Sequence, residues 1–205
     1  MPNDPTVFIV DDDQAVARSL LWLIETVRLR VQLYASAQAY LEAYDPARPG
    51  CLLLDVRMPG ISGLEVQHRL AARGTYHLPI IFITGHGDVQ MAVRAVQAGA
   101  FDFIEKPFND QHLLDRVQHA IARDAEQRAR EGQRDELRQR FASLTPRETE
   151  VLERVTQGLS NKAVANALGL SAKTVEFHRA RVMEKLHARS VADLVTLALR
   201  HRDPA

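Results

Sequence analysis

The 205-residue chain is long enough for two ordinary domains, and a hydrophobic content of 46% favours buried cores over disorder. Lysine plus arginine and aspartate plus glutamate both number 26, so the overall charge excludes a uniformly basic or acidic protein. No apolar run approaches the roughly 18 residues of a membrane helix. The first six residues, MPNDPT, do not resemble a signal peptide. We therefore expect a cytoplasmic protein without a membrane partner.

The charge and cysteine distributions refine this expectation. Residues 1–123 hold 11 basic and 14 acidic side chains, whereas residues 159–202 hold 8 basic and 3 acidic. An acidic N-terminal part and a basic C-terminal part predict two modules, of which the second could bind a polyanion. The single cysteine, Cys51, cannot form an intrachain disulfide and lies in the apolar run CLLLD, so we expect a small buried side chain in a reducing compartment.

Short apolar runs alternate with helical patterns over the first 120 residues. Three of the runs are almost continuously apolar, as in strands that are covered on both faces. This alternation predicts a flavodoxin-like α/β domain with a parallel five-stranded sheet in the order 2-1-3-4-5 and helices on both faces. The expected strands are residues 7–10, 31–34, 51–55, 80–84 and 101–105, and the expected helices between them include residues 15–27, 62–72 and 89–100.

The rest of the chain has helical patterns. Residues 110–122 are amphipathic, and residues 124–141 carry five acidic and five basic side chains with little apolar content. We interpret this second stretch as a charged helical linker, with a flexible charged linker as the alternative. A four-helix all-α domain follows, in which Thr145 and Glu148 form an N-terminal capping box. The predicted domains are therefore residues 1–123 and 142–205, joined by the linker 124–141.

Polar side chains lie at the carboxyl ends of four of the five predicted strands. Ligands of open α/β sheets bind at this edge. Converging carboxylates are ligands for Mg²⁺, and a lysine ammonium can offset the remaining charge. We expect a phosphoryl-transfer site in which Asp55 is the nucleophile, Thr84 and Lys106 hold the phosphoryl group, and Asp13 is only a helix cap. The residues concerned are Asp11, Asp12, Asp55, Thr84 and Lys106.

The segments VDDD, LLLDVRMPGISG, FITGHGDVQMAV and GAFDFIEKPF resemble the receiver domain of two-component response regulators, over about residues 5–123. The resemblance implies that Asp55 accepts a phosphoryl group from a sensor histidine kinase. It also implies that Asp12, Asp55 and the backbone carbonyl of Arg57 bind Mg²⁺ directly, and that Asp11 does so through water. Thr84 and Phe103 would form a conformational switch, and Lys106 would pair with the phosphate and precede Pro107 in a cis peptide.

Residues 159–187 have a helix-turn-helix outline with the break LGLS, and their second helix carries Lys173, Arg179, Arg181 and Lys185. By charge alone, a solvated helical bundle is an equal alternative. The segments LTPRE, GLSNKAVA, LGLS and TVEFH resemble the LuxR-type DNA-binding domain over about residues 141–203. The resemblance implies DNA contacts by Asn161, Lys162, Lys173, Thr174, Glu176, Phe177, His178, Arg179, Ala180 and Arg181, and core positions for Val164, Leu168, Leu170, Val175 and Leu186.

Together, residues 5–123 and 141–203 resemble the NarL/FixJ family. The sequence of the receiver-like part resembles the FixJ branch of that family and regulators of aromatic catabolism. The resemblance implies a transcription regulator that binds promoter DNA as a phosphorylation-induced homodimer, with RNA polymerase as a further partner. Its only chemistry would be Mg²⁺-dependent self-phosphorylation and self-dephosphorylation. Two alternatives stay open: a Mg²⁺-dependent phosphohydrolase with Asp55 or Asp12 as nucleophile, and a LuxR-type regulator that senses a small molecule.

Overall fold

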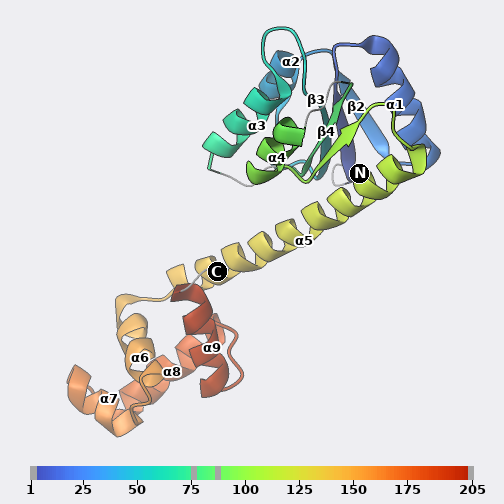
Figure 1. The fold of residues 1–205 in the computed structure, drawn as a ribbon. Helices are drawn as coiled ribbons and strands as arrows, with labels where there is room; N and C mark the ends of the chain where they lie inside the picture. The colour runs from blue at the N-terminus through green and yellow to red at the C-terminus, as the bar shows by residue number, and fades with distance from the viewer. Residues whose placement is uncertain (1–3, 75–77, 86–88, 203–205) are drawn as a thin grey trace. The chain divides into compact units, whose positions relative to one another are not determined.

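The computed structural model describes residues 4–74, 78–85 and 89–202. The chain divides into two compact units, Met1–Arg128 and Ala129–Ala205 (Figure 1). Residues 86–88, within one of the segments that resemble a receiver domain, lie outside the described residues. None of the helices in the described ranges combines the length and apolarity that a membrane span requires.

A parallel five-stranded sheet forms the centre of the first unit. Its order is β2-β1-β3-β4-β5, which confirms the predicted topology. All of β1, β3 and β4 is buried, as expected from their continuous apolar sequences. The strands are β1 (Thr6–Val10), β2 (Arg30–Tyr34), β3 (Gly50–Asp55), β4 (Ile80–Thr84) and β5 (Asp102–Glu105).

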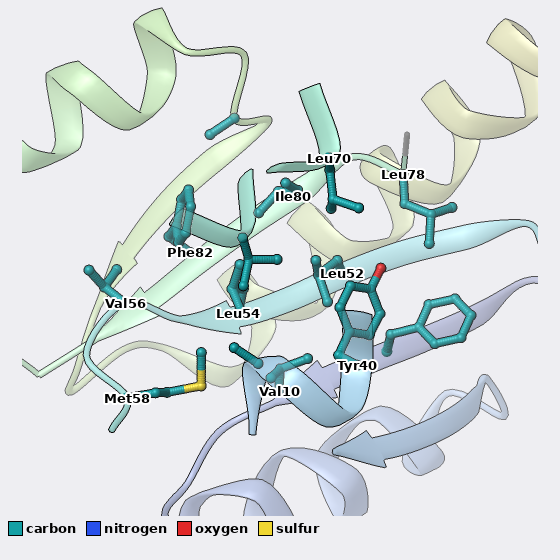
Figure 2. Close-up of a cluster of buried hydrophobic side chains, with 14 of the residues drawn as sticks. Val10, Tyr40, Leu52, Leu54, Val56, Met58, Leu70, Leu78, Ile80 and Phe82 are labelled. Carbon is teal, nitrogen blue, oxygen red and sulfur yellow. The ribbon is translucent and has the colours of Figure 1, made fainter. Parts of the chain in front are cut away.

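Helices cover both faces of this sheet. Alternate residues of the central strands pack on α1 (Gln14–Thr26) and the first half of α5 (Asp110–Ala142) on one face. The other face packs on α2 (Ala37–Ala43), α3 (Gly63–Ala72) and α4 (Val89–Gln97). Figure 2 shows this second core, in which Tyr40 of α2 lies beside Leu52 of β3. The ring of Tyr40 also lies 6.2 Å, between centroids, from that of Phe8 of β1.

Two helices differ from or extend the sequence-based expectation. The seven-residue helix α2 was not predicted, because it is too short for a helical period to be read; the side chain of Ser36 caps it by accepting the N–H of Ala39. Helix α5 runs without interruption through Gly132, so the stretch predicted as a charged helical linker is the C-terminal half of a 33-residue helix.

The second unit is a helical bundle built around an apolar core. Its helices after α5 are α6 (Pro146–Thr156), α7 (Asn161–Leu168), α8 (Ala172–Lys185) and α9 (Val191–Arg202). The predicted capping box of Thr145 and Glu148 is present. Gly169, with φ 66°, ends α7 in the left-handed conformation that turns the chain into α8. The five predicted core residues all belong to this core: Val164, Val175 and Leu186 are buried, and Leu168 and Leu170 pack against them.

Candidate functional site

A lysine and two carboxylates meet at the carboxyl edge of the sheet. The Nζ atom of Lys106, which follows β5, lies 3.0 Å from Oδ2 of Asp11 and 3.4 Å from Oδ1 of Asp55. Asp11 follows β1 and is 4% exposed, and Asp55 ends β3 and is 8% exposed. Because β1 and β3 are neighbours in the sheet, residues 44 positions apart in sequence share one ammonium group. The structure thus brings together three of the predicted site residues.

The three consecutive aspartates after β1 have different environments. Asp11 points to Lys106, and its other oxygen accepts the N–H of Asp13 at 2.9 Å. Asp13 caps α1 by accepting the N–H groups of Ala15 and Val16, as predicted. Asp12 is exposed. The crowding of three negative charges is therefore relieved by one ammonium, one helix N-terminus and solvent.

Backbone packing holds Asp55 in place. Its Oδ2 atom accepts the N–H of Arg57 at 2.8 Å. Gly63, the first residue of α3, packs so closely that a Cβ atom there would lie 2.3 Å from the carbonyl oxygen of Asp55. Its N–H also donates to the carbonyl of Val56 at 3.0 Å. This glycine lets α3 start directly beside the loop that carries Asp55, and its role was not predicted because no pattern in the sequence marks it.

The pKa of the Asp55 carboxyl is raised above its usual range. Burial is the main cause and the charge of Asp11 adds to it, while Lys106 and the N–H of Arg57 act in the opposite direction. The ionised carboxylate is thus held in a site that solvates it incompletely. Added positive charge nearby would stabilise this poorly solvated carboxylate, and conversion of the carboxylate to an ester would remove its charge.

The donor set at this edge suits a hard divalent cation. Within the described part of the chain, no group of three acidic, histidine or cysteine side chains is arranged to hold a metal ion. Mg²⁺, however, typically takes only one or two carboxylates and completes its shell with waters and phosphate oxygens. The carboxylates of Asp11 and Asp55 share one ammonium there, and Asp12 is the exposed neighbour of Asp11, so the donor types at this edge fit such a site.

The predicted switch residues lie on neighbouring strands, Thr84 at the carboxyl end of β4 and Phe103 within β5. Thr84 ends β4 and is 1% exposed, and its carbonyl accepts the N–H of Lys106 at 2.8 Å. Phe103 is half-buried and pairs in register with Phe82, with ring centroids 6.3 Å apart. Because side chains alternate along a strand, Thr84 and Phe103 lie diagonally on one face of the sheet. The Lys106–Pro107 peptide is cis, as the family resemblance implied.

The predicted DNA-contacting residues gather on α7 and α8 in the second unit. Exposed members are Lys162, Lys173, Glu176, Phe177, Ala180 and Arg181, and partly buried members are Asn161, Thr174, His178 and Arg179. Phe177 is 58% exposed, with the guanidinium of Arg181 5.7 Å from its ring centroid. The side chain of Arg179 donates to Oδ1 of Asn161 at 2.8 Å, so it is held in one orientation between the two helices.

Lys185 has a different role from the one its sequence context suggested. Its Nζ atom lies 2.6 Å from Oε2 of Glu148, which is 5% exposed, and donates to the carbonyl of Ser143 at 2.9 Å. Although burial alone raises the pKa of Glu148, the hydrogen bonds from Lys185 and Thr145 outweigh it and hold that pKa below its usual range. The pair ties the end of α8 to the start of α6. No local sequence signal links residues this far apart.

Comparison with known proteins agrees with both halves of this arrangement. Residues 7–118 match the family model of the response regulator receiver domain, and residues 142–198 match that of bacterial regulatory proteins of the luxR family. The transcriptional regulatory protein FixJ of Azorhizobium caulinodans is 48% identical over 97% of this chain and 94% of its own length. Nodulation protein W of Bradyrhizobium diazoefficiens is 48% identical over 94% of this chain and 84% of its own length.

A solved structure, that of the response regulator StyR, is 45% identical with a TM-score of 0.90, covering 96% of this chain and 99% of the other. A receiver domain joined to a LuxR-type DNA-binding domain defines a transcriptional response regulator of a two-component system. The chain belongs to the NarL/FixJ family of these regulators.

Proposed function

We propose that Asp55 is the phosphoacceptor of this response regulator and that a sensor histidine kinase is its donor. In the transfer, an Asp55 carboxylate oxygen forms a bond to phosphorus as the bond from phosphorus to the kinase histidine breaks. The position of Asp55 supports the proposal: it is 8% exposed, ends β3, and shares the ammonium of Lys106 with Asp11.

Mg²⁺ is the proposed cofactor. Asp11, Asp12, Asp55 and the backbone carbonyl of Arg57 would hold it, and when bound it neutralises charge on the phosphoryl oxygens. Lys106 would form an ion pair with the phosphoryl group, and the hydroxyl of Thr84 would donate a hydrogen bond to it. The protein would also exchange phosphate slowly on its own, with a small-molecule donor or with water.

The proposed output is a shift between two receiver conformations. Thr84 and Phe103 share a face of the sheet, so movement of the hydroxyl toward a phosphoryl group would free space for the ring to turn inward. The phosphorylated population would form homodimers, and each dimer would place two copies of α8 on paired half-sites of promoter DNA. RNA polymerase is the further partner that transcriptional control implies.

Within this function, α8 is the proposed recognition helix. Glu176, Phe177 and Ala180 would face base edges in the major groove, with His178, Arg179 and Arg181 beside them. Lys173, Thr174, Asn161 and Lys162 would meet phosphates. The exposure of Lys162, Lys173, Glu176, Phe177, Ala180 and Arg181 supports this assignment, and the bond between Asn161 and Arg179 would fix both groups before binding.

Phosphoryl uptake provides the direct test. The full chain is incubated with Mg²⁺ and acetyl phosphate, and intact-protein mass spectrometry and phosphate release are followed for the wild type and Asp55→Asn. Asp115→Asn, at an exposed position on α5, is the matched control. We expect one phosphoryl group per chain in the wild type and control, and none in Asp55→Asn.

The same experiment separates the alternatives. Continuous phosphate release without a stable adduct would indicate a Mg²⁺-dependent phosphohydrolase. A wild-type chain that takes up no phosphoryl group from donor and Mg²⁺ would instead favour a regulator that senses a small molecule. Labelling that persists in Asp55→Asn would assign the phosphoacceptor to a different residue.

A further inference from the structure

An ion pair between a buried aspartate and a partly buried arginine joins the middle of α5 to the loop between α2 and β3. Asp124 is 1% exposed, and its Oδ2 atom accepts the N–H of Gly50 at 2.9 Å. Both of its carboxylate oxygens lie 2.9 Å from Nε of Arg128, one turn further along the helix. The terminal nitrogens of Arg128 donate to three consecutive carbonyls, those of Pro46 (2.9 Å), Ala47 (3.3 Å) and Arg48 (2.8 Å).

The loop that receives these bonds is itself well fixed. The side chain of Asp45 accepts the N–H of Ala47 at 2.9 Å, and the carbonyl of Asp45 accepts the N–H of Arg48 at 3.2 Å. Gly50 has φ 142°, and a Cβ atom there would lie 1.8 Å from the carbonyl oxygen of Thr6. Local turn chemistry and close packing on β1 therefore hold the acceptor carbonyls in place.

This ion pair extends the contact of α5 beyond its apolar face. The buried apolar residues of α5 are Leu113, Leu114, Val117 and Ala120, and Asp124 is the last buried residue of the helix. Asp124 and Arg128 follow Ala120 at spacings of four and eight residues, so they continue the same stripe. The contact of α5 with the first unit therefore continues beyond its apolar residues as a polar contact.

A polar contact differs from an apolar one in what it constrains. A buried ion pair adds little stability over an apolar pair, because desolvation offsets the charge attraction. The planar guanidinium, however, satisfies five acceptors in one geometry and so specifies both rotation and register. A contact between aliphatic side chains would tolerate sliding and rolling of the helix.

We propose that Asp124 and Arg128 are positioning residues that fix the rotation and register of α5 where it leaves the receiver unit. With the helix fixed there, a conformational change at the receiver reaches residues 129–142 as a movement of the helix. Without the ion pair, the helix frays after Ala120 and the conformational change does not reach residues 129–142. This relay rests on the proposed phosphorylation of Asp55, whereas the anchoring itself does not.

Hydrogen exchange on the full chain tests the anchoring without a phosphoryl donor. The test variant is Asp124→Asn/Arg128→Met, which leaves no unpaired buried charge and so preserves the fold. Arg128→Lys keeps the charge without the planar fork, and Arg134→Met is the control at an exposed position on the same helix. We expect amides of Gly50 and residues 122–130 to exchange about tenfold faster in both ion-pair variants, with residues 51–55 and β4 unchanged.

A second measurement tests the relay. With Mg²⁺ and acetyl phosphate, we expect the wild type and Arg134→Met to change exchange rates in residues 129–142. The double variant should take up the same amount of phosphoryl group without that change. Retained labelling separates a lost relay from a damaged receiver.

Other outcomes would overturn the proposal in distinguishable ways. Unchanged exchange at Gly50 and residues 122–130 would remove the anchoring role. Equal acceleration in residues 51–55 and β4 would show a role in overall stability only. A phosphoryl-linked change that persists in the double variant, or is absent from a labelled wild type, would remove the relay. No labelling at all would count against the proposed function and leave the anchoring result standing.

Discussion

Asp55, the proposed phosphoacceptor, lowers the stability of the fold that holds it. Because burial raises its pKa, the folded chain holds this proton to a higher pH than the unfolded chain does. The free energy of unfolding therefore falls as the pH rises from the ordinary aspartate pKa through the raised pKa of Asp55. Below the ordinary aspartate range this loss of stability is absent.

We expect Asp55→Asn to raise the urea midpoint of the first unit at neutral pH, because the amide removes a poorly solvated charge while Asp11 still pairs with Lys106. The gain should shrink as the pH falls and vanish below the ordinary aspartate pKa. Urea titrations at several pH values measure it, with Asp115→Asn expected to stay within about 0.5 kcal/mol of the wild type. A destabilised Asp55→Asn at neutral pH would contradict this view.

Tyr40 makes a second prediction at the scale of one residue. Its side chain is 1% exposed, and its hydroxyl has no hydrogen-bond partner among the described residues. A buried unsatisfied hydroxyl costs about 1–3 kcal/mol, so Tyr40→Phe should stabilise the first unit by about 1 kcal/mol. Urea denaturation followed by circular dichroism measures this. Tyr44→Phe, at a half-buried position, should have little effect; a loss of stability in Tyr40→Phe would reveal a partner for the hydroxyl.

At the scale of elements, the pair of Glu148 and Lys185 fixes α8 against α6. The lowered pKa of Glu148 means that its ionised form favours the folded state. Its contribution is present above the ordinary glutamate range and is lost as the pH falls through the lowered pKa. The orientation of the proposed recognition helix therefore depends on a buried residue outside the predicted DNA-contacting set.

We expect Glu148→Gln to destabilise the second unit by about 1–2 kcal/mol at neutral pH, since the Lys185 side chain is 31% exposed and water screens part of the pair. The difference from the wild type should disappear in acid. Exchange rates of the Val151 and Val182 amides report it, and Glu150→Gln, on the exposed side of α6, is the control. Equal effects of the two substitutions would show that the pair of Glu148 and Lys185 stabilises the second unit no more than an exposed ion pair does.

The sequence predicted elements well where the chemistry is local. Continuous apolar runs identified β1, β3 and β4, and turn and cap residues identified most helix starts. The meeting of Asp11, Asp55 and Lys106 was also predictable, because the order of a parallel sheet brings the carboxyl ends of their strands to one side. Helix α2 was missed because seven residues carry too little periodicity. The partners of Lys185 and Arg128 were missed because side-chain pairing across a fold leaves no mark on local patterns.

At the scale of the whole molecule, the N-terminal part of the chain is acidic and the C-terminal part is basic. Residues 159–202 hold 8 basic and 3 acidic side chains, although the chain is neutral overall. DNA binding through these residues would release counterions, so affinity should fall steeply with salt.

We expect Lys173→Ala in the full chain to weaken binding to all duplex sequences alike and to reduce the slope of log affinity against log salt by about 1. Arg69→Ala, the same charge change on α3, should leave the slope unaltered. Fluorescence anisotropy with duplexes of several sequences measures both. A flat salt dependence in the wild type would contradict the assignment of α8 as the recognition helix.

The complete burial of Cys51 near the start of β3 gives the chain a built-in reporter. Burial also raises the pKa of its thiol, so the folded chain resists alkylation both by access and by protonation. Since it is the single cysteine, the modification rate of the native chain reads out opening of the sheet directly. Surface cysteines can be introduced as attachment points for spectroscopic labels without first replacing it.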